Sequence, residues 1–169
     1  MSPGHNYFNH RPGAPGTFPT HELDAVEAVA GKGLKGDRFF GRSARNSGQV
    51  TFFSMEVYDE LVPALGLRNA TPAAARRNIV IAGVPLRDLM HAEFAIDGIR
   101  FAGTGHAAPC RWMDSSFGPG AVNALRGRGG LRAKILVGGI LRRGYGTLAS
   151  PHRLERSEAA LAIPDPKLP

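Results

Sequence analysis

Short apolar runs, separated by glycine and proline, dominate the hydrophobic pattern of the chain. Runs of this length that are rich in β-branched and aromatic residues are typical of strands. The predicted strands span residues 22–30, 49–53, 78–82, 93–96, 99–102, 132–137 and 140–142. The run over 78–82 is apolar almost throughout, so we expect a buried strand there. Asp97-Gly98 joins two of the runs and is the strongest hairpin signal in the chain.

Helical patterns are few and short. Ser54 can cap a helix that continues to Gly66, although Pro63 weakens its last turn. Shorter helical turns are predicted over 73–76, 86–90, 119–125 and 154–161. The alternation of long helices and strands that a doubly wound sheet needs is missing. The pattern therefore predicts a mainly β fold with short helices, an antiparallel β-barrel-like architecture.

The length of 169 residues suits one domain with flanking segments. Residues 1–21 are rich in proline, glycine, histidine and asparagine, which predicts an irregular N-terminal arm. The domain is expected over 22–148, and the polar stretch 149–169 is expected to be a C-terminal tail. No apolar run approaches the roughly 20 residues that span a bilayer, and no segment resembles a signal peptide. We therefore expect a cytoplasmic protein without a membrane partner.

Basic residues exceed acidic ones by 21 to 14, for a net charge of +7, and most of them are arginine. Such an excess favours an anionic partner, and arginine suits bidentate recognition of phosphate or carboxylate. A basic surface without a ligand is the alternative on charge alone.

Cys110 is the single cysteine, so a disulfide framework and a cysteine-rich zinc site are excluded. A lone cysteine is more often buried filler than a reactive group. Here Pro109 interrupts regular structure before the thiol, and Arg111 is adjacent. Nearby cations favour the thiolate, which is the nucleophile and the metal ligand. His106 could activate the thiol, or it could be a loop histidine without a role.

Three segments carry candidate anion-binding side chains. The glycine-rich loop from Gly31 to Gly36 matches GxGxxG, but no helical pattern follows it, so a dinucleotide fold is not indicated. This loop could instead present Lys35, Arg38 and Arg42 to an anion, or simply be solvated.

Arg76 and Arg77 precede a predicted strand, where they could be solvated charges or could reach a site with Asn78 as a hydrogen-bonding neighbour. Glycine and arginine alternate over 126–132, which lets Arg128, Arg132 and backbone amides converge on phosphate. We predict that the three segments share one basic cavity.

Several short motifs occur in a characteristic order between about residues 22 and 144. They are Gly31-Lys32-Gly33-Leu34-Lys35-Gly36-Asp37-Arg38, Gln49-Val50-Thr51, Arg76-Arg77-Asn78-Ile79-Val80, Gly83-Val84-Pro85-Leu86, Pro109-Cys110, Gly118-Pro119-Gly120-Ala121 and Gly127-Arg128-Gly129-Gly130-Leu131-Arg132-Ala133. The ordered set resembles the MOSC domain, named for the C-terminal domain of molybdenum-cofactor sulfurase. Trp112-Met113-Asp114 resembles small stand-alone bacterial members.

The resemblance implies a β-barrel-like fold and a role in sulfur transfer or in handling the molybdenum cofactor, molybdopterin. Cys110 would carry a persulfide, as in a sulfur carrier or sulfurtransferase, or would ligate molybdenum. The pterin phosphate would be bound by the basic segments, through Lys35, Arg38, Arg76, Arg77, Asn78, Arg128 and Arg132. Related members often carry a second cysteine and acids before Pro-Cys, whereas this chain has Gly105-His106-Ala107-Ala108.

The expected partners are the anionic pterin or a small-molecule substrate, with a separate sulfur donor or electron-transfer protein. No pyridoxal phosphate site is evident in the sequence. One alternative is a molybdenum-dependent reductase of N-hydroxylated compounds. The alternative of another class is a non-catalytic nucleic-acid-binding module that uses the basic loops.

Overall fold

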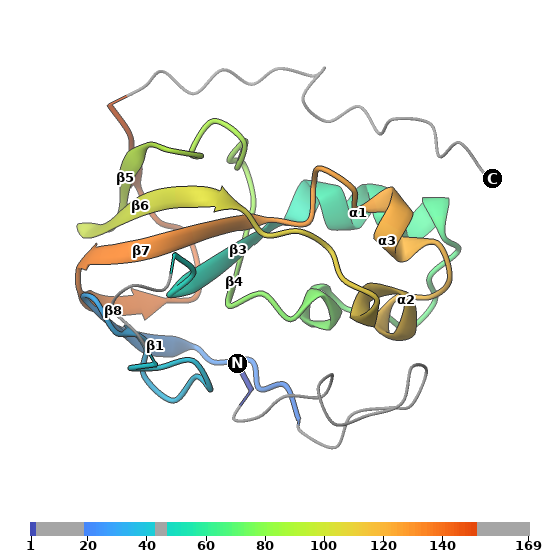
Figure 1. Cartoon of the computed structure of the whole chain (residues 1–169), viewed down its shortest axis with the longest axis horizontal. Helices are drawn as coiled ribbons and strands as arrows, with labels where there is room; N and C mark the ends of the chain where they lie inside the picture. Colours follow the sequence, from blue (N-terminus) through green and yellow to red (C-terminus); the bar gives the residue numbers. More distant parts are fainter. Residues whose placement is uncertain (3–18, 43–46, 152–169) are drawn as a thin grey trace.

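The computed structural model, which describes residues 1–2, 19–42 and 47–151, is built around two β-sheets. One sheet has the strand order β4-β3-β7-β6-β5-β9, and the other has the order β2-β1-β8. The strands are β1 Ala25–Val29, β2 Gly33–Leu34, β3 Val50–Ser54, β4 Ile79–Ile81, β5 Glu93–Ile96, β6 Ile99–His106, β7 Leu131–Val137, β8 Gly139–Arg142 and β9 Leu148–Ala149. The predicted mainly β, barrel-like fold is confirmed (Figure 1).

The helices are short, as the sequence predicts. They are α1 Met55–Ala64, the 3-10 helix η1 Pro72–Ala75, α2 Trp112–Ser116 and α3 Ala121–Ala124. They gather at the end of the large sheet where β6 ends and β7 begins (Figure 1). In the part of the chain that the structure describes, none of the helices could cross a bilayer.

The two strongest local predictions are confirmed. Asp97 and Gly98 both have positive φ, at 48° and 81°, and they connect β5 to β6 with Ile96 opposite Ile99. This is the backbone conformation that makes Asp-Gly favourable in tight hairpins. Helix α1 begins after Ser54, whose Oγ accepts the Val57 N–H at 3.2 Å.

The expectation of a buried strand over 78–82 is wrong in one respect. Strand β4 lies at the edge of the large sheet, and Val80 is 40% exposed. It pairs in parallel with β3, to which α1 and η1 connect it, so the sheet is mixed rather than purely antiparallel. An edge strand has a neighbour on one side only, and therefore an apolar sequence does not guarantee burial on both faces.

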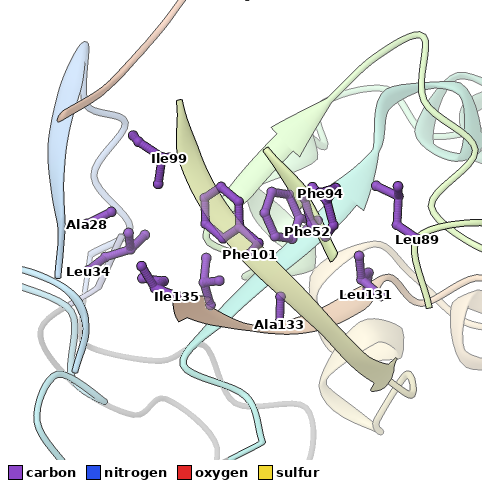
Figure 2. Close-up of a cluster of buried hydrophobic side chains, with 11 residues drawn as sticks. Ala28, Leu34, Phe52, Leu89, Phe94, Ile99, Phe101, Leu131, Ala133 and Ile135 are labelled. Atoms are coloured by element: carbon purple, nitrogen blue, oxygen red, sulfur yellow. The ribbon is translucent and has the colours of Figure 1, made fainter. Parts of the chain in front are cut away.

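Two hydrophobic clusters meet at β3, because successive side chains of a strand point to opposite faces. Phe52 contributes to the cluster between the sheets, where it packs edge-on against Phe94 and Phe101, with ring centroids 5.6 and 5.4 Å away (Figure 2). Phe53 belongs to the second cluster, which the helices supply. This second cluster fixes the helices, and the loops between them, against the end of the sheet.

The expected arm over 1–21 and tail over 149–169 are described only at residues 1–2, 19–21 and 149–151. The helical turn predicted over 154–161 lies outside the described residues.

Candidate functional site

Three chain segments meet where β6 ends and β7 begins. The loop 107–111 follows β6, the turn 125–130 precedes β7, and residues 76–78 precede β4. The Ala107 N–H donates to the Gly130 carbonyl at 2.8 Å and continues the β6–β7 ladder into the loop. The candidate nucleophile Cys110 is thus placed beside the glycine-rich turn.

Arg77 ties these segments together. Its Nε donates to the carbonyl of Gly129 at 2.8 Å, and its Nη2 donates to the carbonyls of Ala107 and Ala108 at 2.9 and 3.0 Å. Charged donors make strong hydrogen bonds to carbonyl oxygens. Arg77 therefore positions the loop that carries Cys110, a role that the sequence did not indicate.

The electrostatics of Arg77 link it to Cys110. Burial lowers the pKa of Arg77 to about 10, while a Cys110 thiolate would raise it and Arg132 and Arg38 lower it further. Arg77 remains a cation at neutral pH because this pKa is well above 7. Cys110 itself is exposed, so the alternative that it fills the core is wrong.

His106, at the end of β6, makes a further contact with the turn 125–130. Its Nε2 accepts the Gly129 N–H at 3.1 Å, which requires that this nitrogen carry no proton. Burial lowers the pKa of His106 below its ordinary value, and Arg77 and Arg132 add to the shift. The neutral imidazole is therefore the form that the fold uses.

This depressed pKa predicts an acid sensitivity. The stabilisation from neutral His106 is fully present above its unfolded pKa of 6.5 and is lost as the pH falls from there through the lower folded value. On acidification from about pH 7.5 to about pH 5, the wild type should lose more free energy of unfolding than His106→Gln. Urea denaturation at each pH would measure this. Equal losses in both proteins would contradict the prediction.

Arg38, Arg76, Arg77 and Arg132 form what we call the basic cluster. The charges of Arg38 and Arg132 lower the pKa of Arg77, and the charge of Arg38 also lowers the pKa of Arg76. Burial lowers the pKa of Arg38 and of Arg76, and in both cases the neighbouring Asp37 opposes the shift. Four arginines from three distant segments thus share one electrostatic environment.

Asp37 is the acid within the basic cluster. It is 8% exposed, and its Oδ1 accepts the Phe39 N–H at 3.0 Å. Its Oδ2 accepts a hydrogen bond from Asn78 Nδ2 at 3.1 Å. Asn78 Oδ1 in turn accepts from both the backbone N–H and the hydroxyl of Thr51 at 2.9 Å. Asn78 therefore connects the glycine-rich loop to β3.

Two of the residues that were expected to bind an anion are instead paired with carboxylates of the protein. Lys35 Nζ is 2.8 Å from Glu27 Oε2 on the surface of the small sheet. Arg128 Nη1 is 2.6 Å from Glu60 Oε2 of α1, and Arg128 Nη2 donates to the Ala124 carbonyl at 3.1 Å. Arg128 therefore holds the turn 125–130 against α1, and we do not include it in the basic cluster.

Trp112 and Asp37 belong to the site although the sequence did not single them out as ligand contacts. The Arg76 guanidinium lies 5.7 Å from the centroid of the Trp112 ring. The only signals in the sequence are that Asp37 precedes Arg38 and that Trp112 follows Cys110 closely. Among the described residues, no group of three or more histidine, cysteine or carboxylate side chains could hold a metal ion. A metal here would depend on Cys110 and on ligands that it brings with it.

The fold and part of the sequence match known proteins. The family model described as MOSC domain matches residues 37–145. YuaD from Bacillus subtilis is similar in structure, with a TM-score of 0.65 and 19% identity over 78% of this chain and 87% of that one. YiiM from Geobacillus stearothermophilus has a TM-score of 0.58 and 18% identity over 87% of this chain and 67% of that one. Among curated proteins, none matches the sequence significantly.

Proposed function

The chain belongs to the MOSC domain family, and from this premise we propose that it binds the molybdenum cofactor or a related anionic ligand at the basic cluster, with Cys110 as the sulfur-carrying or metal-ligating group. MOSC domains are associated with molybdenum-cofactor binding. The observation that carries the proposal is an exposed thiol on a loop that Arg77 holds, with Arg77 itself next to the other arginines of the basic cluster.

The side chains of the cluster fit such a ligand. Arg38 Nε is buried and has no hydrogen-bond partner among the described residues. A buried donor without an acceptor is costly, and a phosphate oxygen would satisfy it. Arg38, Arg76 and Arg132 would hold the anionic part of the cofactor, while Arg77 positions the loop of Cys110. A thiolate is a ligand that suits soft metals and sulfur chemistry.

When bound, molybdenum would supply a redox centre for two-electron chemistry at the position next to Cys110. The chain contributes the binding charge, the orientation of the thiol and a neutral His106 beside the loop. The pairing of Lys35 and Arg128 with carboxylates supports a compact anion site over an extended basic surface for nucleic acid. A separate protein would supply the sulfur or the electrons.

Analysis of the protein made in a host that synthesises the cofactor tests this proposal. We expect molybdenum and pterin to be recovered together in about equal amounts, and Arg38→Gln and Arg132→Gln to lower both by about tenfold or more, as loss of a charge-assisted contact implies. Arg100→Gln, which removes a surface arginine paired with Glu93, is the matched control. Purified wild-type protein that contains neither molybdenum nor pterin would overturn the proposal.

The two candidate activities use the same thiol and are separated by their products. A sulfur carrier should release thiocyanate on treatment with cyanide, and Cys110→Ser should not. The alternative is a molybdenum-dependent reductase of N-hydroxylated compounds. It should reduce such a compound with an artificial electron donor only when molybdenum is bound. Activity without metal and without labile sulfur would contradict both assignments.

A further inference from the structure

A hollow lies next to the basic cluster, and we infer that it binds a small zwitterionic molecule of the amino-acid class. The hollow is open, has a volume of about 490 Å³, and is lined by Glu22, Asn69, Arg76, Trp112 and Ser115, among others. This volume is within the range of small-molecule sites. The inference goes beyond the proposed function because it needs neither molybdenum nor the thiol.

Arg76 supplies the positive charge of the hollow, and its conformation is unusual. Its φ of 52° is in the left-handed region, at the residue that ends η1. Non-glycine residues held in this region are strained and concentrate at functional sites. The guanidinium lies over Trp112, and Nη1 donates to Thr20 Oγ1 at 3.3 Å. These contacts fix the cation at the border between the hollow and the basic cluster.

Glu22 supplies the negative charge. Its carboxylate pairs with Arg143 at 3.5 Å, and both side chains are more than half exposed. An exposed ion pair of this kind contributes little, so an ammonium group could replace Arg143 as the partner of Glu22. One cation and one carboxylate in the same hollow discriminate against a simple anion and against a simple cation. A ligand with both charges satisfies both residues.

The remaining lining indicates a polar side chain of modest size. Asn69, Ser115 and Ser116 offer hydrogen-bonding groups, while Ala73 and Ala74 leave room beside η1. Donors and acceptors of this kind fix the orientation of a ligand whose apolar atoms pack on small side chains. Free glutamine has this combination of charges, amide and length, and we use it as the probe.

Three matched probes test the inference by direct binding, measured by saturation-transfer NMR and by thermal shift. Glutamine carries both charges, N-acetylglutamine only the negative one, and glutaminamide only the positive one. Wild-type protein should bind glutamine at least about fivefold more tightly than either analogue, which corresponds to one exposed charge contact. Arg76→Gln should weaken the binding of glutamine and of N-acetylglutamine by at least about fivefold. Glu22→Gln should remove the preference between these two.

Two further variants locate the binding and separate it from the proposed function. Ser115→Phe fills the hollow from the exposed face of α2 and should block glutamine, while Arg100→Gln should not affect it. Cys110→Ser should retain binding even if no molybdenum is ever found. The inference is overturned if no probe binds at about 10 mM, a concentration that detects millimolar affinities. It is also overturned if the three probes bind equally or if Ser115→Phe has no effect.

Discussion

Replacement of Gly129 by alanine should destabilise the protein by about 2–4 kcal/mol and displace the loop that carries Cys110. A Cβ at this position would lie 2.6 Å from the Ala107 carbonyl oxygen and 2.8 Å from Pro109 N. Both are backbone atoms and cannot rotate away as a side chain could. The loop after β6 must therefore move away from the turn before β7.

The movement would also break the contacts that Gly129 makes to its neighbours. Its carbonyl accepts from Arg77 Nε, and its N–H donates to His106 Nε2. Thermal unfolding should show a fall in Tm of about 5–15 °C. Alkylation of Cys110 by iodoacetamide would report the displacement of the loop.

Gly127→Ala is the matched control for this experiment. Gly127 has a φ of 76°, but a Cβ there would have no atom within 4 Å. Gly127→Ala should lower the free energy of unfolding by only about 1 kcal/mol, because alanine is strained in the left-handed conformation. If Gly129→Ala is no less stable than Gly127→Ala, then the close approach of the two loops does not matter.

The local elements of this fold could be predicted from sequence because their signals are local. The Asp97-Gly98 hairpin and the Ser54 cap each depend on residues within a few positions of one another. Helix α2 was not predicted, because five residues are too few to show helical periodicity. Burial of Met113 and the bond from the Val122 N–H to Asp114 Oδ1 at 2.9 Å stabilise it, and neither is visible in the sequence.

The candidate site likewise combines features that the sequence shows with features that depend on tertiary contacts. Cys110 and the arginines could be selected by residue type, but their roles depend on partners far away in the chain. Glu60, which pairs with Arg128, is 68 residues away, and the acceptors of Arg77 are 30 to 52 residues away. Residue type alone cannot tell a ligand-binding arginine from one that holds two loops together. The distinction depends on which acceptors the fold brings within reach.

The last expected result concerns Arg77, whose charge and whose hydrogen-bonding geometry are tested by two substitutions. Arg77→Met removes the charge and leaves the carbonyls of Ala107, Ala108 and Gly129 without their donor. The bonds to Ala107 and Gly129 are partly buried, and an acceptor left there without a partner is costly, so we expect a loss of about 3 kcal/mol in the free energy of unfolding. The rate at which iodoacetamide alkylates Cys110 should also change, because the loop that carries the thiol is no longer held to the turn 125–130.

Arg77→Lys keeps the charge but cannot reach three carbonyls with one planar group. It should lose nearly as much stability as Arg77→Met, and the alkylation rate of Cys110 should change to a similar extent, because the loop is released in both variants. Arg126→Gln is the control, since Arg126 lies in the same turn and bonds to Asn123, and its effect on stability should be within about 0.5 kcal/mol. An Arg77→Met protein of wild-type stability would show that the three hydrogen bonds do not hold the loops. An unchanged alkylation rate in Arg77→Met would show that Arg77 does not position the loop of Cys110.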